Sequence, residues 1–181
     1  MIIINYLPLS FLLVSALPCL PYIGVIDYGE PRLTKDIDVT LGLGIDGLHK
    51  IREIIPAIPL RTIVDHDEEF VRRTMVFPTV EERSGIRVDF IFSFSPYERQ
   101  AIERAKEVRI GRGSVRFASL EDVVIHKMIA GRARDIEDAR SIIVKNPGYD
   151  FFYIEKWLRE FGESLGKNYL EQFNKTIDEI E

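Results

Sequence analysis

The sequence predicts an α/β (α+β) fold, in which a mixed β-sheet core is flanked by helices and followed by a C-terminal helical subdomain. Residues 36–43 and 85–93 show the alternation of polar and apolar side chains that is typical of half-buried strands. From residue 119 onward the pattern is helical instead. We therefore expect an α/β core over residues 1–118 and a helical subdomain packed on it over residues 119–181.

Local signals place the individual elements. Asp46 and Ser119 are good helix caps, Pro56 stops a helix, and Gly111 with Gly113 favours a turn. The expected elements before the turn are a helix over 9–17, a strand over 21–26, a loop over 27–35, a strand over 36–43, helices over 46–55 and 68–73, strands over 74–80 and 85–93, and a helix over 96–108. After the hairpin through 111–113, helices are expected over 119–131, 135–145, 149–161 and 163–180.

The bulk composition describes an ordinary globular protein. The chain has 181 residues, of which 46% are hydrophobic and 29% charged, so it can bury a sizeable core. The net charge of -5 argues against a broad nucleic-acid-binding surface but leaves room for a local basic patch. Cys19 is the only cysteine, which excludes an internal disulfide and favours a reducing, cytoplasmic location. The three histidines lack zinc-ligand spacing, so metal chemistry would use oxygen ligands.

The first 24 residues carry no charged side chain. A signal peptide has such an apolar middle, but the leading region lacks Lys and Arg, and Pro8, Pro18 and Pro21 interrupt the run. The same prolines argue against a transmembrane helix. We expect a buried helix and strand here and no membrane association. A targeting segment or a wrongly assigned start is the alternative.

Three aspartates on two predicted strands form the first candidate site. Asp36 and Asp38 share one strand face, about 6 to 7 Å apart at Cα, and repel each other unless a cation lies between them. Asp89 interrupts a strand whose other face is apolar, where an unpaired charge is costly. Three carboxylates can hold two magnesium or manganese ions about 3.5 to 4 Å apart. The alternatives are a solvated strand face, and for Asp89 a salt bridge with Arg87 or a helix arginine.

Lys127 forms the second candidate. It lies within the apolar stripe of its helix, beside Leu120, Val123 and Val124, where another apolar residue is expected. A lysine in this position either covers apolar surface with its stem or reaches phosphate oxygens.

Charged residues follow Lys127 on the next helix. Arg132 and Arg134 concentrate positive charge, and Asp135 and Asp138 lie on one side of the helix. Asp135 could instead cap that helix, and Asp138 could pair with Arg134 or Lys127.

These motifs together resemble the nucleotidyltransferase superfamily. The run IGVIDYGEPRLTKDIDV at residues 23–39 is similar to its first motif, in which a hydrophobic residue, two small residues and a spacer precede D-x-D. The segment resembles the version in small prokaryotic members related to the abortive-infection type of toxin. Those proteins carry a third acid on a later strand, as in RVDFIF, and a helix lysine before D-x-x-D, as in EDVVIHKMIAGRARDIED. The resemblance covers about Tyr22 to Ile143.

The resemblance implies a nucleotidyltransferase-like sheet and three groups of site residues. The catalytic and metal-binding residues would be Asp36, Asp38 and Asp89. The nucleotide-binding residues would be Gly24, Arg32 and Lys127. The acceptor-side or supporting residues would be Arg132, Asp135 and Asp138.

The implied reaction is metal-dependent transfer of a nucleoside monophosphate from an NTP to an acceptor hydroxyl, with release of pyrophosphate. The acceptor would be an RNA end such as that of tRNA, a protein or a small molecule, and a cognate antitoxin is an expected partner. Val25 departs from the motif, because a β-branched residue is a poor substitute where backbone approaches a phosphate. A weakened or inactive nucleotide-binding protein of the toxin–antitoxin type is therefore the main alternative. A sugar transferase would leave Asp89 and the Lys127 region unexplained.

Overall fold

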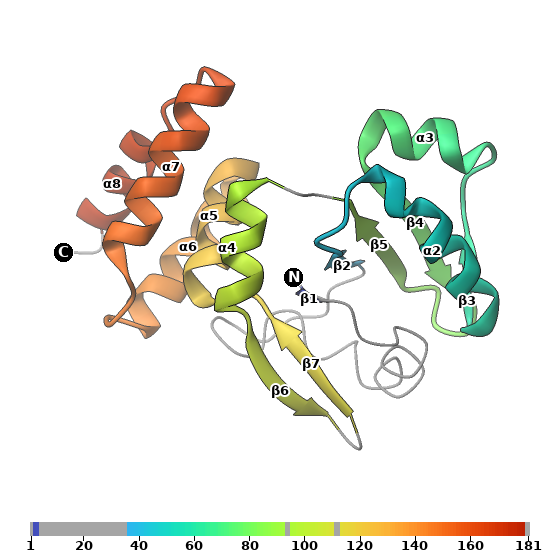
Figure 1. Cartoon of the computed structure of the whole chain (residues 1–181). Coiled ribbons are helices and arrows are strands. Elements are labelled where there is room, and N and C mark those ends of the chain that lie inside the picture. The colour runs from blue at the N-terminus through green and yellow to red at the C-terminus, as the bar shows by residue number, and fades with distance from the viewer. Residues whose placement is uncertain (1, 4–35, 93–94, 111–112, 180–181) are drawn as a thin grey trace. The chain divides into compact units, whose positions relative to one another are not determined.

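A computed structural model describes residues 2–3, 36–92, 95–110 and 113–179. The chain divides into two compact units, and their described parts are residues 2–3, 36–92, 95–110 and 113–118 in the first and residues 119–179 in the second. Figure 1 labels their elements. The helix, strand and loop expected over residues 9–35 lie outside the described ranges.

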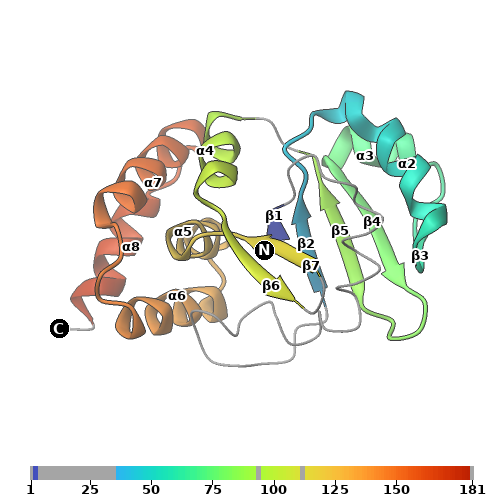
Figure 2. The ribbon, with the colours of Figure 1, turned by 60° about the horizontal axis from the view of Figure 1, so that its bottom comes forward.

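The first unit is built on a mixed sheet, which confirms the expected combination of sheet and helices (Figure 2). Its described strands are β1 (Ile2–Ile3), β2 (Asp36–Thr40), β3 (Leu60–Thr62), β4 (Val76–Glu81), β5 (Arg87–Ile91), β6 (Lys106–Ile110) and β7 (Gly113–Phe117). Their order is β3-β4-β5-β2-β1-β7-β6. The β1–β2 and β2–β5 pairs are parallel, and the other pairs are antiparallel.

Helices cover the apolar face of this sheet. The described helices of the first unit are η2 (Ile45–Gly47), α2 (Leu48–Ile54), η3 (Ile55–Ala57), α3 (Asp67–Thr74) and α4 (Pro96–Arg104). Leu48 and Ile51 of α2 and Val71 of α3 join one buried cluster with Phe77 and Phe90 of the strands. This packing defines the inner face of the sheet.

The central strands alternate between this inner face and the opposite face. Val39, Val88 and Phe90 are 0% exposed. Between them, Asp38 is exposed and Asp89 is half-buried. The predicted alternation is confirmed in β5 and in β2 as far as Val39, whereas Thr40, expected on the face of the aspartates, is buried. The apolar positions hold Asp38 and Asp89 on the face away from the core.

Helix α4 ends earlier than the sequence predicts. It begins with a capping box between Ser95 and Glu98, but it stops at Arg104 and not near Val108. The following residues form β6, which pairs with β7 along its whole length. Strand pairing with a segment beyond the turn therefore overrides the local helical pattern. Strand β3 is also absent from the predicted elements, and Gly47, not Asp46, is the N-cap of α2.

The second unit is helical, as expected. Its described helices are α5 (Leu120–Ala130), α6 (Ala133–Lys145), α7 (Phe151–Leu165) and α8 (Tyr169–Asp178). Ser119 caps α5, as predicted, by accepting a hydrogen bond from the Asp122 amide. The buried Asp122 carboxylate in turn accepts hydrogen bonds from the hydroxyls of Ser119, at 2.7 Å, and Tyr153, at 2.9 Å. These bonds tie the start of α5 to α7.

Three predicted helix boundaries in this unit are wrong. Helix α8 begins at Tyr169 and not at Glu163. Helix α6 begins at Ala133, with Arg132 as its N-cap, and not at Asp135. Helix α7 continues to Leu165, past the break expected near Phe161. A Cβ atom at position 162 would lie 2.7 Å from the Lys167 carbonyl oxygen, so Gly162 permits the chain to fold back closely while the helix continues.

Among the described residues, no helix combines the length and apolar content that crossing a bilayer requires.

We predict that Phe90→Ala lowers the free energy of unfolding by about 3 to 5 kcal/mol, because a fully buried ring is replaced by a cavity. Phe152→Ala is the matched control, since that ring is 78% exposed and should change stability by less than about 0.5 kcal/mol. Urea denaturation measures both. Equal losses in the two variants would contradict the inner face assigned to β5.

Candidate functional site

Two of the predicted aspartates face each other across adjacent strands. In the parallel pair of β2 and β5, Asp38 is the register partner of Asp89. Register partners project from the same face of a sheet, and neighbouring strands lie about 4.8 Å apart. The pairing therefore brings two carboxylates from residues far apart in sequence onto one surface.

The remaining residues of this cluster are Asp36 and Arg87. Asp36 is the register partner of Arg87, and its side chain lies outside the described part of the structure. Arg87 Nε donates to Asp89 Oδ1 at 2.7 Å. The Arg87 side chain is 46% exposed and that of Asp89 is 16% exposed. The salt bridge weighed as an alternative for Asp89 is thus present, and it orients the carboxylate.

The chemistry of this donor set fits a magnesium ion. Asp38 and Asp89 offer only oxygen ligands, and the ion pair with Arg87 uses only one of the Asp89 oxygens. Magnesium usually takes one or two carboxylates together with substrate oxygens and water. Among the described side chains, no group of three His, Cys, Asp or Glu residues is placed to hold a metal ion. The Asp36 side chain is not among the described ones.

Three other residues in the predicted phosphate-binding region cannot be placed. Gly24, Val25 and Arg32 all lie within residues 4–35, outside the described ranges. The predicted triphosphate cradle therefore stays a prediction.

Lys127 and the two aspartates of the D-x-x-D motif form one cluster in the second unit. Lys127 Nζ lies 2.9 Å from Asp135 Oδ1 and 2.8 Å from Asp138 Oδ2. The three side chains are 25%, 12% and 20% exposed. Arg132 Nε is 4.0 Å from Asp135 Oδ2, and its side chain is 85% exposed. The pairing of Lys127 with Asp138, one of the alternatives, is observed, and Asp135 joins it instead of capping its helix.

This arrangement is an ion-pair bridge between α5 and α6. The ammonium holds together two carboxylates one helical turn apart, and Lys127 keeps most of its side chain away from solvent. Removing the Lys127 ammonium would leave the partly buried carboxylates of Asp135 and Asp138 close to each other without a positive charge between them.

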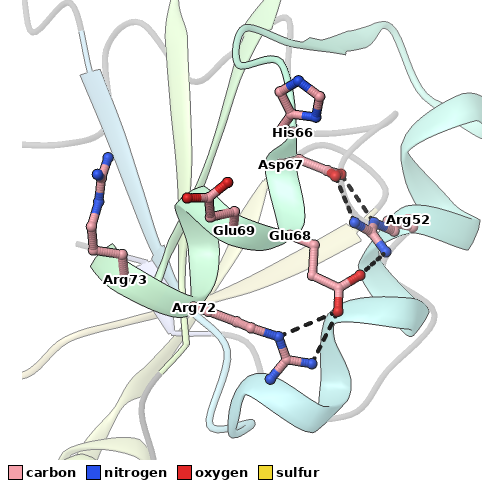
Figure 3. A pocket seen from close by; sticks show the side chains of 7 residues that line it. All are labelled: Arg52, His66, Asp67, Glu68, Glu69, Arg72 and Arg73. Atoms are coloured by element: carbon pink, nitrogen blue, oxygen red, sulfur yellow. Dashed lines mark hydrogen bonds and ion pairs between the residues drawn. The ribbon is translucent and has the colours of Figure 1, made fainter.

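A further charged surface, which the sequence analysis missed, joins α2 to α3 (Figure 3). It borders a pocket of about 780 Å³ lined by Arg52, His66, Asp67, Glu68, Glu69, Arg72 and Arg73. The Arg52 guanidinium donates to Asp67 Oδ2 at 3.0 Å and to Oδ1 at 2.5 Å, and it also bonds Glu68 at 3.1 Å. Its basic and acidic side chains balance in number, so the pocket has no net charge with which to select an anion.

The ion pairs of this surface shift the pKa values of their members. The hydrogen bond from Arg52 lowers the pKa of Asp67, against a smaller opposing effect of burial. The pKa of Glu68 is lowered mainly by its hydrogen bond from Arg72 and secondly by that from Arg52. The bond to Asp67 in turn raises the pKa of Arg52.

Helix α3 begins and ends at strained residues. His66 has a φ of 54° and Met75 a φ of 60°, in the left-handed region that non-glycine residues rarely adopt. Such backbone persists only where surrounding contacts fix it. The Arg52 contacts and the buried Val71 supply those contacts, so we assign this surface a structural role. The only local sequence signal for it is the i, i+4 spacing of Glu68 and Arg72.

We predict that Arg52→Gln lowers the free energy of unfolding by about 0.5 to 1 kcal/mol at neutral pH, because the pair is partly exposed and screened by solvent. The folded pKa of Asp67 is below its unfolded value of about 3.9. The stabilisation is therefore complete above that value and is lost as the pH falls through the folded pKa.

Urea denaturation across this pH range checks the prediction, with Arg61→Gln as the control. Arg61 is exposed, and its guanidinium donates a hydrogen bond to the neighbouring Thr62 carbonyl. The stability curves of wild type and Arg52→Gln should converge in acid. A difference between them that stays constant down to the lowest pH would contradict the assigned ion pair.

We also predict that Lys127→Met destabilises the helical unit by about 1 to 2 kcal/mol, a value reduced for partial exposure, because Asp135 and Asp138 then repel each other. Adding Asp138→Asn should recover part of the loss, since one of the two charges is removed. Thermal unfolding followed by circular dichroism measures both effects. A double variant less stable than Lys127→Met would show that repulsion is not the cause.

A scan against models of protein families found no match, and a search of curated proteins found no similar sequence. The relation to nucleotidyltransferases is therefore a resemblance carried by the residues quoted above.

Proposed function

We propose that this protein is a metal-dependent nucleotidyltransferase that moves a nucleoside monophosphate from an NTP to an acceptor hydroxyl and releases pyrophosphate. The observation that supports this function best is the register pairing of Asp38 with Asp89 on one face of the sheet. A nucleotidyltransferase-like core, with the D-x-D strand beside the strand of the third acid, is the finer fold assignment that we propose with it.

In this proposal the aspartates have distinct tasks. Asp38 and Asp89, with Asp36, would hold magnesium, or manganese in its place. The bound ion would neutralise phosphate charge in the triphosphate and its transition state. Asp89 would also take the proton of the acceptor hydroxyl, through the carboxylate oxygen that Arg87 does not bond. Arg87 would fix the orientation of that carboxylate.

The nucleotide would be bound by residues outside the carboxylate cluster. Gly24 would let backbone approach the phosphates, and Arg32 and Lys127 would balance their charge. Asp135 and Asp138 hold the Lys127 ammonium in a single position, which is the supporting role that we propose for them. Arg132, whose side chain is 85% exposed, would contact the acceptor.

A second candidate is a nucleotide-binding protein without turnover, for example one half of a toxin–antitoxin pair. Two observations favour it. Arg87 already bonds one of the two Asp89 oxygens, and Val25 replaces a small residue of the motif. Under this candidate, metal-dependent NTP binding would occur without release of pyrophosphate.

The test is release of pyrophosphate from each ribonucleoside triphosphate in a magnesium titration, with mixed RNA and protein acceptors. We predict that Asp38→Asn and Asp89→Asn each lower the rate by at least about 100-fold, because electrostatic stabilisation supplies most of the rate in phosphoryl transfer. Asp46→Asn is the matched control, since Asp46 is an exposed carboxylate of the same unit outside the cluster. Circular dichroism should show that all three variants stay folded.

The outcomes separate the two candidates. Release that survives in Asp38→Asn would contradict the carboxylate site. Binding of an NTP that depends on Asp38 and magnesium, without release under any acceptor condition, would favour the second candidate. Absence of any NTP binding would contradict both candidate functions.

A further inference from the structure

The described strands of the sheet end in two edge strands of different character (Figure 2). Strand β3 forms one edge and β6 the other, and among the described residues β6 pairs only with β7. The outer side of an edge strand presents backbone N–H and C=O groups to which another strand can bond. Strand β3 has only three residues, a length that offers little to a partner, whereas β6 has five.

The side chains of β6 alternate between the two faces of the sheet. Val108 packs against the buried core cluster, so Glu107 and Arg109 lie on the opposite face. Lys106, the first residue of the strand, is the register partner of Phe117 and shares the core-side face with Val108. The face of β6 away from the core therefore carries one acid and one base, two residues apart.

Glu107 and Arg109 are the exposed charges of this face. In the part of the chain that the structure describes, neither side chain has a salt bridge or a hydrogen bond to another residue. Arg116, the register partner of Glu107 on β7, donates instead to the carbonyl oxygens of Ile102, at 2.6 Å, and Ala105, at 3.3 Å. Both charges of β6 can therefore pair with a strand added at the edge.

An antiparallel copy of the same strand would complement these charges. If a two-fold axis passes through Val108, residue 107 of one copy lies opposite residue 109 of the other. Each Glu107 then faces an Arg109, twice in the dimer, and Val108 meets its own copy on the core side. Opposite charges directly across two strands stabilise their pairing, and like charges destabilise it.

Neighbouring registers that keep the two faces aligned do not have this property. An axis through residue 107 places the two Glu107 side chains opposite each other, and an axis through residue 109 does the same to the two Arg109 side chains. At the other edge of the sheet, an axis through the middle of β3 places two copies of Arg61 opposite each other. Of these pairings, only the one centred on Val108 brings opposite charges together.

We propose that β6 pairs with β6 of a second copy of this chain, antiparallel and centred on Val108, and so joins two sheets into one. A second copy is favoured over a foreign extended peptide because its own sequence supplies the matching charges. Five paired residues from each copy make a small interface of the weak class, below about 1,200 Å², so the dimer forms and dissociates with concentration. This inference does not rest on the proposed function, and the pairing needs neither NTP nor metal.

The test is sedimentation velocity of the full chain from about 5 to 500 µM, in EDTA and without NTP. The wild type should show a monomer–dimer equilibrium in this range. Glu107→Arg and Arg109→Glu should each weaken dimerisation by at least about tenfold, because each replaces two attractive pairs with two repulsive ones. The exchange Glu107→Arg/Arg109→Glu should recover the affinity of the wild type, since it restores opposite charges in the same register.

Arg83→Glu is the matched control for these variants. It changes the net charge by the same amount as Arg109→Glu, at an exposed turn position outside β6, and should leave dimerisation unchanged. Circular dichroism of every variant guards against misfolding as the cause of lost dimerisation.

Disulfide crosslinking tests the register. In a Cys19→Ser background, which leaves no other thiol, Val108→Cys should form an intermolecular disulfide under mild oxidation. The two Cα atoms at this position lie about 4.5 to 5.5 Å apart across the two-fold axis, within the range of a disulfide. Arg109→Cys should crosslink far less, because its two copies lie about 8 Å apart, beyond that range.

Four results would overturn the inference. They are a wild type that stays monomeric at every concentration, a dimer that both single reversals leave intact, a charge exchange that dimerises as weakly as the single variants, and an equal loss in Arg83→Glu. Asp38→Asn separates the inference from the proposed function, since that variant should lose pyrophosphate release and keep the dimer.

Discussion

The parallel register of β2 and β5 is the constraint on which the candidate site depends. Val39, Val88 and Phe90 fill the core from these two strands, so a slip of either strand by one residue would turn its own aspartate, Asp38 or Asp89, into the apolar interior. Burying a carboxylate without a partner costs several kcal/mol, which makes the shifted register inaccessible. The packing that stabilises the sheet therefore also fixes which side chains share its outer face, and it brings together acids that are far apart in the sequence.

Two charged networks of the described residues hold helices together. Arg52 neutralises acids of the next helix, and Lys127 does the same for Asp135 and Asp138. The second network also holds the Lys127 ammonium in one position, which the proposed contact with a phosphate requires. Asp38 and Asp89 differ from both networks, because their register pairing brings two carboxylates onto one sheet face. A cation bound there would reduce the repulsion between them.

The features of the structure that depend only on residues close together in the chain can be predicted from local patterns in the sequence. The alternation around Val88 and Phe90, the cap at Ser119 and the closeness of Arg87 to Asp89 all follow from spacings of a few residues. Contacts between distant residues decide the rest. Helix α4 stops because β6 pairs with β7, and the close approach of Lys167 at Gly162 permits α7 to continue. The contact between Arg52 and Asp67 likewise depends on how separate elements pack. The pairing of Asp38 with Asp89 also depends on the strand order, because the two residues are far apart in the sequence.

The most direct measurement is the anomalous diffraction of crystals grown with manganese and a non-hydrolysable NTP analogue. We predict an anomalous peak within coordination distance of both Asp38 and Asp89, with the phosphates of the analogue as further ligands. A map that shows neither manganese nor the analogue's phosphates at these carboxylates, with Arg87 still bonded to Asp89, would contradict the proposed metal site. The aspartates would then supply the negative charges of a structural ion-pair network on the sheet.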